Sequence, residues 1–387
     1  MEKIAASLLA TAGIACAQTY NYDSSSETLV ITGKGNTVAD RITPEEPITP
    51  GSTVPGTSEI FGDTKEIILK DVWTSPDSIR IKYVEPTSEG NNTTLKLENS
   101  RLGASGDFDK GGTGLILILD SQSRLDLFGN RLTNTIRIEN QGHISCSNST
   151  VRENSYLWDN KTTTGSSGVL GGSGYYRFGN VSSIETDKDF GLIKTSGQIT
   201  DLEISGIYNV DGNSAKTIGD DAYIVGVNTS SSSDGQAMTI SGSLTIEAKQ
   251  GTGIGILANQ LGSDDVSLKN DYSGQIYVTA KDAFGVKVGK NAAKDPSAAG
   301  DIYSLSVGGL DINNTITSGS TQGEATGIYA KSVKRDLTAD AITVEGYTSA
   351  TGIHLTEGGR NLTISDMQVS ARNATATGII AARGIDT

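Results

Sequence analysis

The chain has 387 residues, of which 47 are glycine, 6 are phenylalanine, 2 are tryptophan and 35% are hydrophobic. This low apolar content suits a fold with a thin core better than a compact globule of the same length. The formal net charge of −14 argues against a nucleic-acid partner, because such a surface needs a basic footprint. No apolar run reaches the roughly 20 residues that a transmembrane helix requires.

Residues 1–17 predict a signal peptide. Lys3 precedes an apolar stretch at 4–14, and Ala15-Cys16-Ala17 forms a small-residue cleavage site. Cys16 also allows lipidation as an alternative, although Gly13 stands where a lipobox usually carries leucine. Cleavage after Ala17 would leave Cys146 as the remaining cysteine, so we expect no intramolecular disulfide.

Residues 18–62 predict an irregular entrance to the fold. A strand is expected at 27–32, and a polar stretch then follows that Pro44, Pro47, Pro50 and Pro55 interrupt. Proline cannot donate to a strand ladder, so this stretch is not a central strand. We expect a cap or loop that protects the edge of the first coil.

Residues 63–146 predict less regular coils of the same fold. Short apolar alternations indicate strands at 66–70, 78–84, 94–98, 115–119, 124–128 and 135–139. Asn99 and Asn140 fall at strand ends, where asparagine side chains can form hydrogen bonds from coil to coil.

Residues 147–185 are rich in glycine, serine and asparagine, and they predict a long loop between two stretches of one solenoid. Tyr156, Trp158, Tyr175 and Tyr176 lie in or beside this region. The alternative is a projecting binding loop, because aromatic side chains on loops supply contact area.

Residues 186–387 contain a repeated phrase. Ala-Thr-Gly-Ile at 325–328 returns at 350–353 and 376–379, and weaker copies precede it. The spacings between the recurring glycines are 35, 29, 30, 42, 25 and 26 residues, which is typical of a solenoid or array. We expect each glycine at a corner where a Cβ would clash. These glycines are Gly191, Gly226, Gly255, Gly285, Gly327, Gly352 and Gly378.

Each repeat holds three alternating apolar runs, which predict three short strands per coil. The first run follows the glycine and places Ile328, Ile353 and Ile379 in a common dry interior. The second run is represented by Met238/Ile240, Val266/Leu268, Leu305/Val307, Leu337/Ala339 and Leu362/Ile364. The third is represented by Leu244/Ile246, Ile276/Val278, Leu310/Ile312, Ala341/Val344 and Met367/Val369. The predicted fold is an all-β, right-handed parallel β-helix with coils of roughly 25–30 residues.

The unit of 42 residues carries two insertions, near 290–301 and 315–324, which are candidates for functional protrusions. The chain stops at Thr387 just after a first strand, so we expect it to be a fragment or a truncated reading frame.

The predicted signal, the Gly/Asn/Ser/Thr-rich composition, the near-absence of cysteine and the repeated Thr-Gly-Ile phrases together resemble the passenger region of bacterial autotransporters and related surface adhesins. No segment resembles their C-terminal translocator barrel. The resemblance implies an exported Gram-negative protein, located at the cell surface, in association with the outer membrane, or outside the cell. It implies adhesion to host or cell-surface glycans or proteins, or self-association. Membrane contact is expected only through a translocator outside this chain.

One alternative is a polysaccharide-active β-helix enzyme, and another is a structural stalk for a further C-terminal domain. Asp211, Asp220 and Asp221 are similar to the clustered aspartates of polygalacturonases, which act as paired acid and base. However, Asp211 and Asp220 are nine residues apart rather than nearly a full coil, and the family's Gly-His-Gly and Arg-x-Lys elements are missing. We therefore expect a protein that is not an enzyme.

The two histidines give no metal pattern. His354 occupies the variable position after Gly352, which Leu257, Lys287, Tyr329 and Ile380 occupy in other coils, and this position is expected to form an outward stripe. His143 is expected at a turn, and an isolated imidazole makes no metal site. The sequence predicts no catalytic, cofactor-binding or metal-binding residue, and no cofactor.

Overall fold

The computed structural model describes residues 19–23, 25–33, 66–72, 93–105, 115–128, 132–133, 135–147, 150–152, 155–160, 166–179, 181, 183–195, 199–212, 217–219, 221–230, 236–268, 270–290, 295–314 and 323–386. The predicted signal peptide at 1–17, the proline-rich stretch, the predicted strand at 78–84 and most of the insertion at 315–324 lie outside these residues. The chain forms two compact units. The N-terminal unit comprises Met1–Ser147 and Val169–Tyr176, and the C-terminal unit comprises Asn148–Gly168 and Arg177–Thr387.

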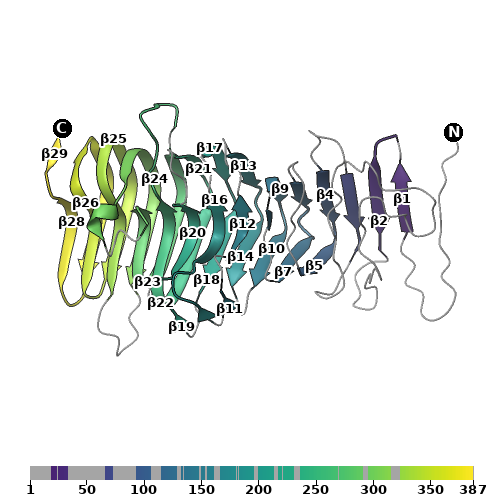
Figure 1. The fold of residues 1–387 in the computed structure, drawn as a ribbon, viewed down its shortest axis with the longest axis horizontal. Helices are drawn as coiled ribbons and strands as arrows, with labels where there is room; N and C mark the ends of the chain where they lie inside the picture. The colour runs from purple at the N-terminus through teal and green to yellow at the C-terminus, as the bar shows by residue number, and fades with distance from the viewer. Residues whose placement is uncertain are drawn as a thin grey trace. The chain divides into compact units, whose positions relative to one another are not determined.

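The protein is all-β and solenoid-like, with parallel strands stacked in register (Figure 1). In the N-terminal unit the first ladder runs through β2 (Thr28–Thr32), β3 (Glu66–Lys70), β4 (Thr93–Glu98), β6 (Leu115–Leu119) and β9 (Thr135–Asn140). A second ladder contains β5 (Arg101–Ser105), β7 (Arg124–Phe128) and β10 (His143–Ser147). Six of the strands predicted between 27 and 139 are confirmed within one residue at each end, and the seventh, at 78–84, lies outside the described residues.

The N-terminal edge of this unit is covered by a strand of the opposite direction. β1 (Thr19–Asp23) folds back through a turn and pairs antiparallel with β2. The turn is held by Asp23, whose Oδ1 accepts hydrogen bonds from the Ser25 backbone N–H at 2.9 Å and from the Ser25 hydroxyl at 2.6 Å. An antiparallel hairpin that the sequence analysis did not predict therefore covers the edge of β2, while the proline-rich stretch expected to do so lies outside the described residues.

Straight columns of leucine and isoleucine form the core of the N-terminal unit. Alternation along each strand places one residue in two on the inner side, and parallel register stacks these residues directly. One column contains Leu29, Ile67, Leu95, Leu117 and Ile138. All five are at most 5% exposed. Cys146 stacks on Leu127 in the second ladder, is 2% exposed and forms no disulfide.

Polar side chains connect the coils of this unit at one corner. Asn99 Nδ2 donates to Asp71 Oδ1 at 2.6 Å, and the Asn99 backbone N–H donates to Asp120 Oδ2 at 2.9 Å. Asn99 has a φ of 45°, which asparagine tolerates better than most residues. The predicted coil-to-coil bonding of Asn99 is confirmed, with aspartates rather than asparagines as its partners.

The C-terminal unit contains the regular repeats. Its strands are β11 (Thr150–Val151), β12 (Ser155–Asn160), β15 (Ser183–Ile184), β16 (Phe190–Thr195), β17 (Ile199–Ile204), β18 (Ile207–Asp211), β19 (Thr217–Ile218), β20 (Tyr223–Thr229), β21 (Gln236–Ile240), β22 (Ser243–Ala258), β23 (Asn270–Val288), β24 (Asp301–Asn314), β25 (Glu324–Gly346), β26 (Ser349–Arg360), β27 (Leu362–Ala371), β28 (Thr375–Ala381) and β29 (Ile385–Asp386). Long strands such as β25 pass around a corner and contribute to more than one ladder.

The prediction of a long loop at 147–185 was wrong. This region contains β11, β12, β13 (Ser166–Gly171), β14 (Tyr175–Gly179) and β15. Tyr156 and Tyr176 are fully buried and Trp158 is 1% exposed, so these aromatic side chains pack in the interior and are not displayed. High glycine and serine content indicated a loop, but the few large apolar residues between them were sufficient for strands.

Three parallel ladders make up the coils of the C-terminal unit. The first ladder contains β12, β16, β20, 252–258, 282–288, 324–330, 349–355 and β28. The second pairs β21 with 270–272, 305–307, 337–339 and 362–364, and the third stacks the runs that begin at Ser243. Two assignments were wrong. Asn270 and Tyr272, not Val266 and Leu268, occupy the second ladder, and Ile342 replaces Ala341 in the third.

The central column of the first ladder is confirmed as a set of ladder partners, but the expected burial of Ile379 is wrong. Trp158, Ile193, Val227, Ile256, Val286, Ile328, Ile353 and Ile379 are partners in successive coils. Ile328 and Ile353 are fully buried. Ile379 lies on the last rung of this ladder that the structure describes and is 39% exposed.

The recurring glycines do not lie at corners, which is a second correction. They lie inside the first-ladder strands and stack on one another. A Cβ on Gly327 would lie 2.5 Å from the Gly352 carbonyl oxygen and 2.9 Å from Ile342 Cγ2 of the third ladder. A corner in β22 is instead occupied by Gly251, with a φ of 89°. The recurring glycine allows two strands and an opposing side chain to approach closely.

No helix in the described part of the chain is long and apolar enough to cross a membrane.

Candidate functional site

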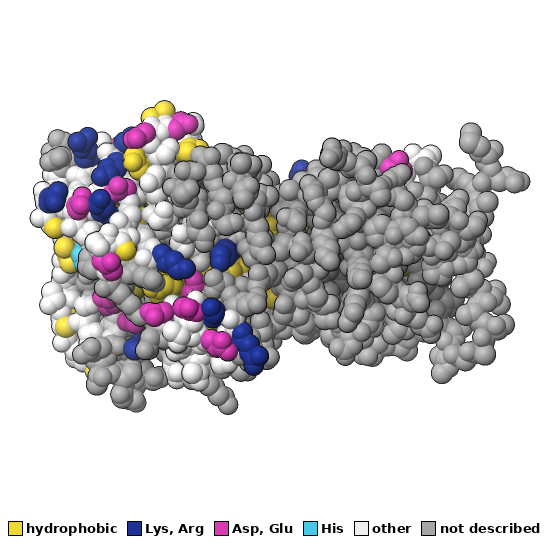
Figure 2. All heavy atoms as spheres, in the orientation of Figure 1, with side chains coloured by type: hydrophobic (Ala, Val, Ile, Leu, Met, Phe, Trp, Pro, Cys, Tyr) yellow, Lys and Arg dark blue, Asp and Glu magenta, His cyan; other side chains and the backbone are white. Residues whose placement is uncertain are grey.

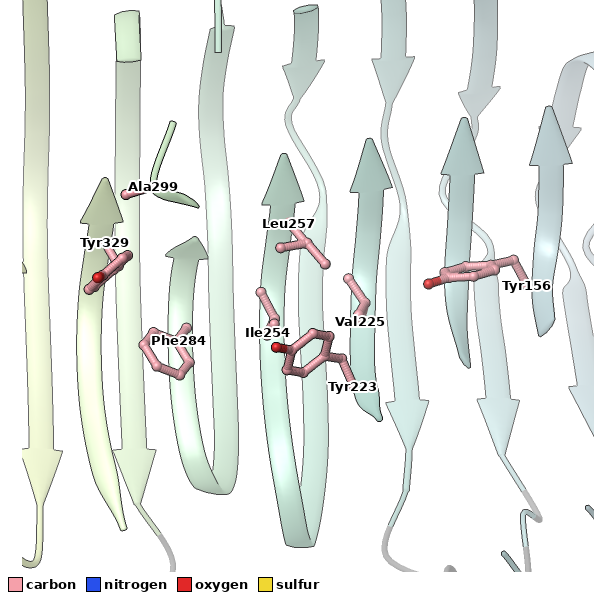
Figure 3. Close-up of a cluster of buried hydrophobic side chains, with 8 residues drawn as sticks. All are labelled: Tyr156, Tyr223, Val225, Ile254, Leu257, Phe284, Ala299 and Tyr329. Atoms are coloured by element: carbon pink, nitrogen blue, oxygen red, sulfur yellow. The ribbon is translucent and has the colours of Figure 1, made fainter. Parts of the chain in front are cut away.

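The outer side of the first ladder carries a second layer of buried side chains. A Cβ on Gly253 or Gly255 would meet Ala280 Cβ at 2.8 Å or Ile276 Cγ2 at 2.6 Å, so both glycines face the core. Ile254 between them therefore faces outward, yet it is fully buried. It belongs to an outer cluster of eight residues, Tyr156, Tyr223, Val225, Ile254, Leu257, Phe284, Ala299 and Tyr329 (Figure 3).

This arrangement arises at the recurring glycine, where the register of the ladder stays constant. The ladder pairs Ile254 with Phe284 and Ile256 with Val286, but no bridge joins Gly255 to Gly285. Strict alternation is interrupted there, so that both the glycine and the following aliphatic residue are accommodated on the core side. The position after that, occupied by Leu257, returns to the outer side.

The expected outward stripe exists as a column, and most of it is buried. Lys194, Asn228, Leu257, Lys287, Tyr329, His354 and Ile380 are partners in successive coils. Lys287 is fully buried and Tyr329 is 5% exposed, whereas Ile380 is 36% exposed. The middle of the column, from Asn228 to Tyr329, is thus buried, while Lys194 at one end and His354 and Ile380 at the other reach solvent.

Residues 295–300, which we call the outer segment, cover part of this column. Ala299 belongs to the outer cluster and is 6% exposed. The segment contains the 3-10 helix Pro296–Ala298, and it is fixed by hydrogen bonds from Gly300 N to Val288 O at 3.1 Å and from Lys331 N to Gly300 O at 2.7 Å. The described part of the insertion at 290–301 therefore folds back onto the ladder, and the expected protrusion is not seen there.

The ammonium of Lys287 lies among aromatic rings. Its Nζ is 4.6 Å from the centroid of the Tyr223 ring and 4.8 Å from that of Phe284. Both distances are within the range of cation–π attraction. Burial and the charge of Asp282 raise the pKa of Glu324, the first residue of β25, and the charge of Lys287 opposes this rise.

A buried carboxylate lies on the same side of the ladder. Asp189 is 1% exposed, and its Oδ1 accepts a hydrogen bond from the Tyr223 backbone N–H at 3.1 Å. Burial raises the pKa of Asp189, while Lys290 and Lys194 oppose the rise. Burial together with the charges of Asp189 and Asp221 raises the pKa of Tyr223 to about 12, so its hydroxyl keeps its proton at neutral pH.

Tyr156 and Asn228 connect two coils through this layer. Asn228 Nδ2 donates to the Tyr156 hydroxyl oxygen at 2.7 Å, and Asn228 Oδ1 accepts from the Ser230 backbone N–H at 3.0 Å. Lys194 Nζ lies 5.6 Å from the centroid of the Tyr156 ring. The layer thus contains amide, ammonium and phenol groups in addition to apolar contacts.

His354 lies farther along the column. Its ring packs edge to face against Tyr329, with centroids 5.0 Å apart. Partial burial lowers the pKa of His354, so the neutral imidazole is favoured in the folded protein.

The three aspartates of the enzyme alternative are not assembled into one site by the described residues. Asp211 Oδ2 lies 2.8 Å from Arg177 Nη2 in an ion pair, and Asp221 lies in the turn before β20. Asp220 lies outside the described residues. His143, expected at a turn, is in β10 and packs against Tyr175 with ring centroids 5.0 Å apart.

Within the ranges described above, no group of three or more histidine, cysteine, aspartate or glutamate side chains could hold a metal ion. No family model, curated protein or solved structure matches this chain. The outer layer of the first ladder is therefore the most distinctive candidate site, and sequence reasoning identified its column but not its burial.

Proposed function

We propose that this protein is an exported bacterial surface protein of the autotransporter-passenger type, and that it acts in adhesion by binding host or cell-surface glycans or proteins. We further propose that its solenoid is a right-handed parallel β-helix. Right-twisted strands joined by crossovers to parallel neighbours adopt the right-handed connection in about 98% of cases.

The observation that carries this proposal is the in-register stacking of outward side chains. On the outer side of the third ladder, one column contains Thr245, Tyr277, Asp311, Thr343 and Gln368 in successive coils. Acidic and basic side chains also lie close together on the C-terminal coils (Figure 2). Solenoids use such extended repetitive surfaces for binding.

Binding is favoured over glycoside hydrolysis because Asp211 is held by Arg177. A hydrolase needs two carboxyl groups that face each other across the scissile bond. The ion pair with Arg177, at 2.8 Å, gives Asp211 a structural partner within the solenoid.

The proposal is tested with purified residues 18–387 on arrays of immobilised glycans and extracellular-matrix proteins, together with protease treatment of intact cells that express the full chain. We expect saturable binding to at least one surface, and loss of the protein from intact cells on protease treatment. Release of reducing sugar from a polysaccharide panel, abolished by Asp211→Asn, would establish the enzyme alternative. Full protease resistance in intact cells, with digestion after lysis, would refute surface display.

A further inference from the structure

Charge is segregated on the coils of the C-terminal unit. The outer side of the second and third ladders, which we call the acidic face, is formed by strands without a lysine or arginine in five successive coils, at 236–247, 270–280, 305–314, 337–346 and 362–371. These strands contain six acidic residues, none of which is buried: Glu247, Asp271, Asp311, Asp340, Glu345 and Asp366. The basic residues of the same coils lie outside these segments. The acidic face therefore complements a cationic partner.

Tyr277 and Asp311 are uncommitted side chains on this face. They are partners in adjacent strands of the third ladder, Tyr277 is 39% exposed, and Asp311 is also exposed. In the described part of the chain, neither side chain forms a hydrogen bond or an ion pair. Glu345, in contrast, pairs with Arg372 Nη2 at 2.8 Å. The ring of Tyr277 and the carboxylate of Asp311 are therefore available to a ligand.

An amide group lies beside this pair. Gln275 is two residues before Tyr277, so both side chains lie on the same side of the strand. Gln275 pairs with Gly309 of the next coil, and a Cβ on Gly309 would clash with the Gln275 amide. The amide thus lies over bare backbone. An aromatic ring, a carboxylate and an amide therefore meet on two adjacent strands.

The chemistry of this set suits a sugar better than a protein. A sugar packs its C–H face on an aromatic ring, while its polar groups bond to carboxylates and amides. A protein partner would need an apolar interface core. Tyr277 is the one large hydrophobic side chain that is exposed in the five strand segments. Strands recur about every 4.8 Å, close to the length of one sugar unit in an extended polysaccharide.

We propose that the acidic face binds a linear polysaccharide whose sugars carry free amino groups. One sugar ring stacks on Tyr277, and an ammonium group of the polysaccharide lies at Asp311. Acetylation of the amino groups removes the charge that the carboxylates attract. This inference rests on the proposed adhesive function and specifies the class of glycan that is bound.

The test is binding of the purified full chain to a chitosan hexamer at about pH 6, where the amines of glucosamine are charged. The fully acetylated chitin hexamer and hexalysine are the comparison probes. We expect saturable binding of the chitosan hexamer that weakens with added salt. The chitin hexamer should bind at least about tenfold more weakly, because several exposed charge pairs are lost.

Substitutions on the face locate the site. Tyr277→Ala should weaken binding of the chitosan hexamer by about tenfold, as expected for an aromatic anchor. Asp311→Asn should weaken it by about threefold, the size of one exposed charge pair. Asp295→Asn removes the same charge outside the acidic face, so it is the matched control and should leave the affinity unchanged. All three side chains are exposed, and circular dichroism checks that the variants fold.

Several results would overturn the proposal. Equal affinity for the two sugar hexamers would show that free amines are not recognised, and equal losses in Asp311→Asn and Asp295→Asn would show that the face is not the site. Tighter binding of hexalysine than of the chitosan hexamer would assign the face to a basic peptide. Binding of other glycans or matrix proteins without the chitosan hexamer would refute this inference and leave adhesion standing. Absence of binding to every surface would refute both.

Discussion

Replacement of Gly327 by alanine tests whether the recurring glycines keep adjacent coils in contact. The new Cβ would lie 2.5 Å from the Gly352 carbonyl oxygen and 2.9 Å from Ile342 Cγ2. The carbonyl belongs to the backbone of a buried strand and cannot rotate away. Overpacking of this kind typically costs about 1–3 kcal/mol. Alanine in a strand otherwise gains about 0.5–1 kcal/mol over glycine. The middle of the first range less the second gives an expected net loss of about 1 kcal/mol.

The same phrase supplies a matched control. Gly378 has the same neighbours in sequence, but a Cβ there would meet only Met367 Sδ, at 3.5 Å. This is ordinary van der Waals contact, so Gly378→Ala should be neutral or stabilising by about 0.5 kcal/mol.

The assay is native-state hydrogen exchange of β25 and β26, because a solenoid of this length need not unfold in a single step. Gly327→Ala should lower the opening free energy of both strands, while Gly378→Ala should leave it unchanged or raised. Equal effects of the two substitutions would refute close packing at the glycine column.

Three further predictions concern the packing and titration of the C-terminal unit. Ile353→Ala should lower the opening free energy of β26 by about 2–5 kcal/mol because it leaves a cavity. Ile380→Ala, at a 36% exposed position, should cost less than about 1 kcal/mol, and equal losses in hydrogen exchange would argue against a shared interior. Tyr156→Phe removes the acceptor for Asn228 Nδ2 and should cost about 1–3 kcal/mol in denaturant unfolding. Tyr277→Phe, at a 39% exposed position, should have little effect, and a neutral Tyr156→Phe would contradict a stabilising hydrogen bond between Asn228 and Tyr156. Because the folded pKa of His354 is lowered, its contribution to stability is present above the unfolded value near 6.5 and is lost as the pH falls through the folded pKa. Hydrogen exchange of β26 should accelerate between these two pKa values in the wild type but not in His354→Gln, and an identical pH profile of the variant would exclude a contribution of His354 to stability.

The strands and their stacking could be predicted because alternation and repeat spacing are local properties of the sequence. The spacing of Ile328 and Ile353 placed them in one column, and their pairing confirms it. The interruptions could not be predicted as readily. Val266 and Leu268 match the second run in composition, yet Val266 is 69% exposed, because the chain makes an excursion before β23.

The burial of the outer layer depended on information that the repeat pattern lacks. Lys287 and Tyr329 were placed in the outward column, but no repeat or motif indicated that residues 295–300 fold back over it. The glycine column was likewise found by its spacing and misplaced at a corner. Its actual role depends on the carbonyl of the next coil, which a single repeat does not reveal.

In-register stacking of coils can be measured directly by cysteine cross-linking. Thr343 and Gln368 are exposed partners in adjacent coils. Neighbouring strands are about 4.8 Å apart, which suits a disulfide. In residues 18–387 with Cys146→Ala, the Thr343→Cys/Gln368→Cys pair should oxidise rapidly and completely. The Thr343→Cys/Ser370→Cys pair, two residues out of register, should not. Equal oxidation of both pairs, or preferential oxidation of the second, would contradict the stacked arrangement.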